Sequence, residues 1–215
     1  MEQKKFPLNR IIKGKVRGIA ELQDKIMVEL ASKFDIVLHG GTAIWRIYGG
    51  RRFSFDIDLY YKRPKDILDY FEKSENFELV KKRITRSDVV YLRFREGAIL
   101  VEMEISPLFK KISKIDGEFN MIDGNSLVVN TLSATNLLKE KIDAFKNRKK
   151  PRDLYDIFFL LDFADTKNIR KELGLLLSKL KSEPADFSGL KEIILIGKSP
   201  DFETIKRKMI RYAKG

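Results

Sequence analysis

Two aspartates in the segment FSFDIDLYY (53–61) are the residues best suited to chemistry. Apolar and polar residues alternate along this segment, as in a strand with one buried face. Asp56 and Asp58 are two positions apart, so both carboxylates share one face of that strand, about 6–7 Å apart along it. Close carboxylates repel each other unless a cation lies between them, and Mg²⁺ and Mn²⁺ prefer such hard oxygen ligands. The pair predicts a site for one of these ions, although an isolated Asp-x-Asp also occurs by chance in many sheets.

A glycine pair precedes the aspartates. Gly40 and Gly41 follow FDIVLH (34–39), which has the pattern of a short buried strand, and lead into TAIWRIYGG (42–50), which is typical of a short helix. Glycine lets the backbone approach a phosphate closely, and the N–H groups at the start of a helix attract one. Thr42 can cap that helix or donate to a phosphate oxygen. The short spacing predicts that a phosphate cradle and the metal ligands meet at one sheet edge.

A second acidic pair lies in AILVEMEIS (98–106), a strand that follows a turn at Gly97. Glu102 and Glu104 are again two positions apart and share a face. Either glutamate can complete a site of three carboxylates with the two aspartates. Such sites hold two cations that stabilise the attacking and leaving oxygens of a phosphoryl transfer.

These segments resemble the nucleotidyltransferase family typified by the AbiEii and AbiGii toxins. Its first block, a glycine pair with Thr-Ala followed by Arg-Phe-Ser and Asp-Ile-Asp, matches Gly40, Gly41, Thr42, Ala43, Arg52, Phe53, Ser54, Asp56 and Asp58. Its second block matches Lys141, Ala144, Arg148, Arg152, Asp153 and Asp156, and its strand ending in an acid matches Glu104–Ile105–Ser106. One departure is His39, which stands where relatives often have Lys.

The resemblance implies a DNA polymerase β-like enzyme that uses Mg²⁺ to move a nucleoside monophosphate from an NTP to a hydroxyl acceptor. It implies that Asp56, Asp58 and Glu104 bind metal and that these acids, Lys141 and Asp156 form the active site. The residues it implies in nucleotide binding are Gly40, Gly41, Thr42, Arg52, Ser54 and Lys141. Some relatives are toxins that modify tRNA 3′ ends and are paired with an antitoxin. The expected partners are therefore an NTP, RNA of the tRNA class and an antitoxin protein.

The second block also has a purely physical interpretation. Lys141 and Arg148 are seven residues apart on one helix face, and Asp153 and Asp156 are three apart on the next helix. These basic and acidic stripes can form salt bridges with each other. Alternatively, Lys141 neutralises a triphosphate while Asp156 orients Lys141 or the acceptor. Arg52 either pairs with Asp153 or contacts phosphate.

The elements that must position these residues indicate an α+β fold, with a nucleotidyltransferase-like mixed sheet, flanking helices and a C-terminal helical domain. We expect an N-terminal helical segment over 1–33 that packs on the core, the core itself over 34–128, and the helical domain over 129–215. The remaining patterns predict helices over 16–33, 64–75, 132–150 (with Ser133 as N-cap) and 151–164, and paired strands over 77–85 and 88–96.

Composition limits the function classes. The 215 residues contain no Cys, which excludes disulfides, thiolate zinc sites and Cys nucleophiles, and one His cannot form a cluster of histidine ligands. The net charge of +12 favours a polyanionic partner. Basic residues gather in 81–95 and 139–152. Such runs are commonly solvated faces; on the transferase hypothesis they hold RNA. The absence of a long apolar run excludes a membrane span and predicts a cytoplasmic protein.

Two other functions share part of this pattern. A decayed transferase fold can survive as a non-catalytic nucleic-acid-binding module, which would not need all of the acids. A two-metal nuclease uses the same carboxylates but does not need the glycine pair. Lengthening or shortening of an RNA substrate distinguishes the transferase from the nuclease.

Overall fold

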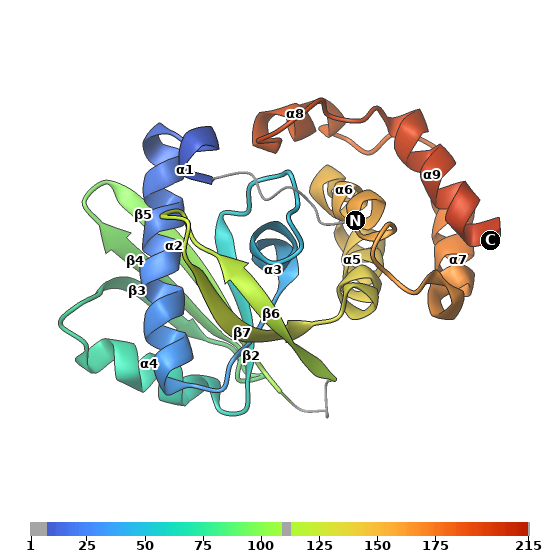
Figure 1. Ribbon diagram of the computed structural model, residues 1–215. Helices are drawn as coiled ribbons and strands as arrows, with labels where there is room; N and C mark the ends of the chain where they lie inside the picture. The colour runs from blue at the N-terminus through green and yellow to red at the C-terminus, as the bar shows by residue number, and fades with distance from the viewer. Residues whose placement is uncertain (1–7, 109–112, 215) are drawn as a thin grey trace. The chain divides into compact units, whose positions relative to one another are not determined.

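The computed structural model describes residues 8–108 and 113–214, which form two compact units (Figure 1). The N-terminal unit contains the chain up to Gly49 and then Ser54–Leu132, and the C-terminal unit contains Gly50–Phe53 and the chain from Ser133 onward. The predicted boundary at residue 128 falls inside a strand, because the last strand of the sheet continues to Leu132. Each unit is described by itself below.

The N-terminal unit is built on a mixed seven-stranded sheet with the order β3-β4-β5-β2-β1-β7-β6. The β2–β5 and β1–β7 pairs are parallel and the others are antiparallel. The mixed sheet confirms the predicted fold class. The strands are β1 (Val37–His39), β2 (Asp56–Tyr61), β3 (Glu78–Ile84), β4 (Val90–Glu96), β5 (Ile99–Pro107), β6 (Lys114–Asn120) and β7 (Ser126–Leu132).

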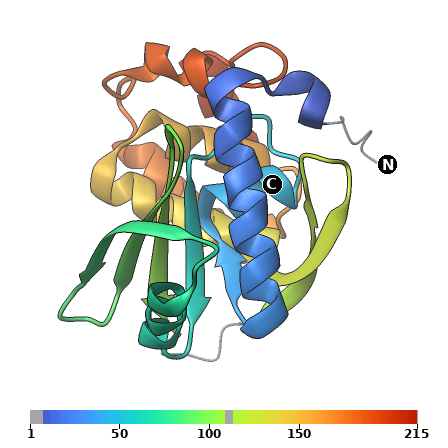
Figure 2. The same ribbon diagram turned by 90° about the vertical axis from the view of Figure 1, so that its left-hand side faces the viewer.

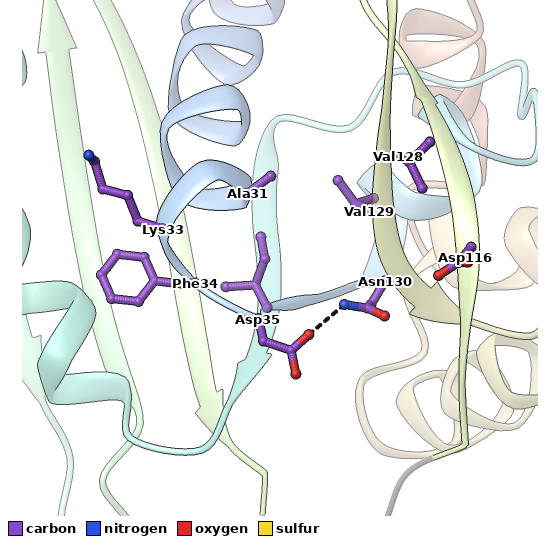
Figure 3. Close-up of a pocket in the computed structure, with 9 residues that line it drawn as sticks. Ala31, Lys33, Phe34, Asp35, Asp116, Val128, Val129 and Asn130 are labelled. Atoms are coloured by element: carbon purple, nitrogen blue, oxygen red, sulfur yellow. Dashed lines mark hydrogen bonds between the residues drawn. The ribbon is translucent and has the colours of Figure 1, made fainter.

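Helices cover one face of this sheet. They are α2 (Gly14–Lys33), α3 (Gly40–Arg46) and α4 (Pro64–Lys73), and the short helix α1 (Leu8–Ile11), which buries none of its residues, precedes α2. The alternating residues of the strands that face α2 and α4 are buried, and Phe71 of α4 contacts Phe94 of β4 with ring centroids 4.7 Å apart. Figure 2 shows α2 in front of the sheet. The polar residues of the same strands therefore project from the opposite face.

The C-terminal unit is helical, as predicted, with α5 (Ala134–Arg148), α6 (Pro151–Leu160), α7 (Arg170–Lys179), α8 (Leu190–Ile193) and α9 (Phe202–Lys214). The Ser133 hydroxyl accepts a hydrogen bond from the Asn136 N–H at 3.3 Å, which confirms the predicted N-cap of α5. Pro151 occupies the first turn of α6, where its missing N–H costs no hydrogen bond. No helix in the described residues is long and apolar enough to span a membrane.

The short segment Gly50–Phe53 belongs to the C-terminal unit because its backbone forms hydrogen bonds with residues of that unit. The Phe53 N–H donates to the Ile193 carbonyl, and the Leu195 N–H donates to the Arg51 carbonyl, both at 2.7 Å. Phe53 is buried, as its apolar character predicts. The chain thus contributes to the C-terminal unit just before it forms the strand that carries the two aspartates.

Candidate active site

The four acidic residues singled out in the sequence lie on two neighbouring central strands. Asp56 and Asp58 of β2 are paired with Glu102 and Glu104 of β5 in the parallel ladder. All four project from the face opposite α2 and α4, because the residues between them are buried against those helices. Asp58 and Glu104 therefore lie side by side on strands about 4.8 Å apart.

The two glutamates have different surroundings. The Glu102 side chain is half-exposed and forms an ion pair with Arg93 of β4, whose Nε lies 2.9 Å from Oε1. Glu104 is less exposed and accepts a hydrogen bond from the Ser106 hydroxyl at 3.3 Å. Among the described residues, neither Asp58 nor Glu104 forms an ion pair with a Lys or Arg. These surroundings favour Glu104 over Glu102 as the third acid.

Gly40 lies directly against Asp58. Its φ of +69° is in the left-handed region, and a Cβ added there would lie 1.9 Å from Asp58 Oδ2. Both the backbone conformation and the lack of space therefore require glycine. The predicted proximity of the glycine pair to the aspartates is present in the fold.

Thr42 has a different role from either one considered in the sequence. Its side chain is fully buried, and its hydroxyl donates to the Asp56 carbonyl at 2.5 Å. The helix begins at Gly40, with His39 as the N-cap residue, so the prediction that Thr42 caps it is wrong. Thr42 instead fixes the backbone at the start of β2.

A buried glutamine supports the same stretch of backbone. The Gln23 amide of α2 donates to the carbonyls of Ser54 and Phe55, both at 3.0 Å. Ser54 is itself buried, and it lies two residues before β2 begins. Gln23 and Thr42 together hold the residues that lead into the two aspartates. Nothing in the sequence marks Gln23 for this role beyond its place in an amphipathic helix.

The acids belong to a longer row of residues, which we call the central row. It contains one directly paired residue from each of five adjacent strands: Arg83, Tyr91, Glu104, Asp58 and His39. At its inner end the His39 ring stacks on the Tyr60 ring, with centroids 3.8 Å apart and planes 11° apart. The sequence did not identify Tyr91, because only the strand register shows that it lies beside Glu104.

The chemistry of these donors fits Mg²⁺ or Mn²⁺. Mg²⁺ is held in proteins by one or two carboxylates and completes its shell with phosphate and water oxygens. Asp58 and Glu104 supply two adjacent carboxylates without a competing cation, and Asp56 follows on the same strand face. In residues 8–108 and 113–214, no three Asp, Glu or His side chains converge tightly enough to enclose an ion by themselves. Phosphate or water oxygens would therefore complete the shell of a bound ion.

The charged residues of the second block form a compact network inside the C-terminal unit. Arg52 donates from Nε and Nη2 to the two carboxylate oxygens of Asp156, both at 2.5 Å. Lys141 Nζ lies 3.1 Å from Asp156 Oδ2 and 3.9 Å from Asp153 Oδ1. Arg148 donates from Nε and Nη2 to the Asp153 carboxylate, both at 2.6 Å. The prediction that Arg52 pairs with Asp153 is wrong, since its partner is Asp156.

This network is buried as well as paired. Asp153 and Asp156 are fully buried, and Lys141 and Arg52 are nearly so. Burial alone would raise the pKa of Asp156, but the charges of Arg52 and Lys141 outweigh it and lower that pKa below its usual value. The structure shows the salt-bridged arrangement of the two helices. The roles of Arg52, Lys141 and Asp156 toward a nucleotide stay predictions.

Many residues of the two basic tracts also have acidic partners. Lys82, Arg93 and Arg95 pair with Glu72, Glu102 and Glu78, respectively, and Lys146 pairs with Asp143. Their charge is therefore less available to a polyanion than the sequence count implies.

Comparisons with known proteins place the chain in a family. Residues 25–213 match the family model described as nucleotidyl transferase AbiEii toxin, type IV toxin–antitoxin system. A crystal structure of a Helicobacter pylori protein described provisionally as a nucleotidyltransferase has a TM-score of 0.67 and 20% identity, covering 94% of this chain and 95% of that one. The crystal structure of JHP933 from Helicobacter pylori has a TM-score of 0.61 and 23% identity, with coverages of 94% and 92%. These two likenesses show a shared fold, and no curated protein matches the chain.

The family match spans both the acidic sheet face and the ion network, and it confirms the resemblance seen in the motifs. The chain is therefore a nucleotidyltransferase and belongs to the AbiEii toxin family of type IV toxin–antitoxin systems.

Proposed function

We propose that this nucleotidyltransferase moves a nucleoside monophosphate from an NTP to a hydroxyl of an RNA acceptor, and that Asp56, Asp58 and Glu104 hold the Mg²⁺ it uses. The observation that supports this most is the direct pairing of Asp58 with Glu104 beside a position where only glycine fits. Adjacent like charges destabilise a fold, so their presence here favours a ligand-binding role.

The chain's own residues supply the rest of the chemistry. A bound Mg²⁺ neutralises the charge that develops on the phosphate oxygens during transfer. Asp56 or Glu104 accepts the proton of the acceptor hydroxyl, whose oxygen forms a bond to the α-phosphorus as the bond to pyrophosphate breaks. The backbone at Gly40 and Gly41 carries no side chain that would keep a triphosphate away.

The acceptor is proposed from charge and from the family. A net charge of +12 favours a polyanion, and the motif resemblance points to the 3′ end of tRNA. Membership in a toxin–antitoxin family also suggests an antitoxin protein as a partner.

The first experiment is a transfer assay. The purified chain is incubated with each labelled NTP in turn, Mg²⁺ and total tRNA, and the label that remains with the RNA is measured. We expect transfer with at least one nucleotide and none after chelation of the metal. A folded protein that transfers no label, or that shortens the RNA, would contradict the proposal.

A matched pair of variants assigns the third acid. Glu104→Gln should lower the transfer rate about a thousandfold, since a lost ligand removes several kcal/mol of transition-state stabilisation. Glu102→Gln changes the same residue type on the same strand face and should leave the rate within about threefold. Equal losses in both variants, with unchanged thermal unfolding, would contradict the assignment of Glu104.

A further inference from the structure

The outer part of the central row combines an aromatic ring with a cation. Tyr91 of β4 lies beside Glu104, and Arg83 of β3 lies beside Tyr91. The Arg83 guanidinium carbon is 4.3 Å from the centroid of the Tyr91 ring. The row therefore changes from acidic at its centre to cationic and aromatic at its outer end.

Arg83 differs from Lys82, Arg93 and Arg95 in what it contacts. Lys82 lies on the opposite face of β3 and pairs with Glu72 of α4, while Arg93 and Arg95 pair with glutamates. Within the described part of the chain, Arg83 pairs with no carboxylate, and its side chain is exposed. Its charge stays available to an anion, and its flat guanidinium is stacked on a ring.

Arg83 and Tyr91 lie where a bound polymer would pass if its end must reach the carboxylates of Glu104 and Asp58. Adjacent strands are about 4.8 Å apart, so Tyr91 is one strand from Glu104 and two strands from Asp58. Arg83 is on β3, which is an edge strand of the sheet. A polymer that enters over this edge crosses Arg83 and Tyr91 before its end arrives at the carboxylates.

A cation beside an aromatic ring is the combination that binds single-stranded nucleic acid, because bases stack on the ring while the cation attracts the phosphates. We propose that Arg83 and Tyr91 bind the single-stranded end of the RNA acceptor and guide its terminal hydroxyl to Asp58 and Glu104. This inference rests on the proposed transfer to RNA and names the surface that receives the acceptor.

The test measures binding without catalysis. Fluorescence anisotropy of a labelled single-stranded RNA of about 12 nucleotides is recorded without NTP or metal, over a series of salt concentrations. Arg83→Ala should weaken binding about tenfold and lower the slope of log K against log salt concentration by about 1. Tyr91→Ala should weaken binding about tenfold and leave that slope unchanged, because it removes stacking rather than charge.

Lys82→Ala is the matched control, since it removes one positive charge from the same strand on the opposite face. It should change the affinity by less than about twofold. The C-terminal unit carries 21 Lys and Arg against 12 Asp and Glu, so most of the salt slope should persist in every variant. If Tyr91→Ala does not fold, the contrast between Arg83→Ala and Lys82→Ala decides the question.

Two outcomes would overturn the inference: equal weakening of RNA binding by Arg83→Ala and Lys82→Ala, or an Arg83→Ala variant whose RNA binding is intact. Asp58→Ala separates this inference from the proposed function. This variant should lose transfer and retain RNA binding. A wild-type chain that binds RNA through Arg83 but transfers no nucleotide would contradict the proposed reaction and leave the RNA-binding surface intact.

Discussion

Two clusters of charged residues in this chain are arranged in opposite ways. The acidic site, formed by Asp56, Asp58 and Glu104, places like charges side by side on a partly exposed sheet face. The buried ion network, formed by Arg52, Lys141, Arg148, Asp153 and Asp156, places opposite charges in contact inside the C-terminal unit. Among the described residues, Asp58 and Glu104 of the acidic site have no Lys or Arg partner. Every member of the buried ion network, in contrast, contacts a residue of opposite charge.

On the function proposed here, we infer that the acidic site serves the reaction and that the buried ion network serves the fold. Carboxylates on adjacent strands repel each other and contribute nothing to stability unless a ligand binds between them. When two cations contact a buried carboxylate, their attraction offsets the cost of removing it from water, and the group can then stabilise the fold. Both clusters lie within the residues that match the family model, although their charges are arranged in opposite ways.

The largest effect expected from this comparison is at Asp156. Asp156→Ala should lower the free energy of unfolding by about 3–5 kcal/mol, because Arg52 and Lys141 stay buried without their anion. Urea denaturation of the full chain measures this change. Asp58→Ala is the contrast from the acidic site and should change the unfolding free energy by less than about 1 kcal/mol. An Asp156→Ala variant that is as stable as the wild type but inactive would show that the network serves catalysis instead.

The next effect tests how closely the glycine pair is fitted to the acids. Gly40→Ala should reduce the transfer rate about a hundredfold, because its Cβ displaces the Asp58 carboxylate from the site. Gly97→Ala is a matched control: Gly97 also has a positive φ, of +58°, but a Cβ there meets no atom within 4 Å. That control should lose about 1 kcal/mol of stability from its backbone conformation and keep its activity. Equal rates in the two variants would contradict the close packing of Gly40 on Asp58.

Local patterns predicted much of this molecule, because they depend on neighbours in sequence. The alternation around Asp56 and Asp58 placed both carboxylates on one strand face, and Ser133 and Pro151 marked the starts of two helices. The β6 strand has no such alternation, since KIDGEFN contains a central glycine and few apolar residues. The sequence pattern therefore predicted no specific strand there.

Long-range pairings could not be predicted in the same way. The motif that runs from Arg52 to Asp58 is continuous in sequence, yet Arg52 belongs to the C-terminal unit and pairs there with Asp156, 104 positions away, whereas Asp58 belongs to the N-terminal unit. The resemblance points to Glu104, but the physical difference between Glu104 and Glu102 depends on the register of β5 against β2 and β4. Neither a helical nor a strand period contains that information, since each describes a single element.

The smallest effect should come from the exposed arm of the ion network. The Arg148 side chain is 44% exposed, whereas that of Arg52 is 5% exposed, although each makes two hydrogen bonds to one carboxylate. Arg148→Ala should lower the free energy of unfolding by about 1 kcal/mol, because water can replace the lost donors at Asp153 and Lys141 stays nearby. Arg52→Ala, measured by the same urea denaturation, should cost several times more since water cannot reach Asp156. Equal costs for the two arginines would mean that pairing alone, and not burial, determines how strongly each member of the network stabilises the fold.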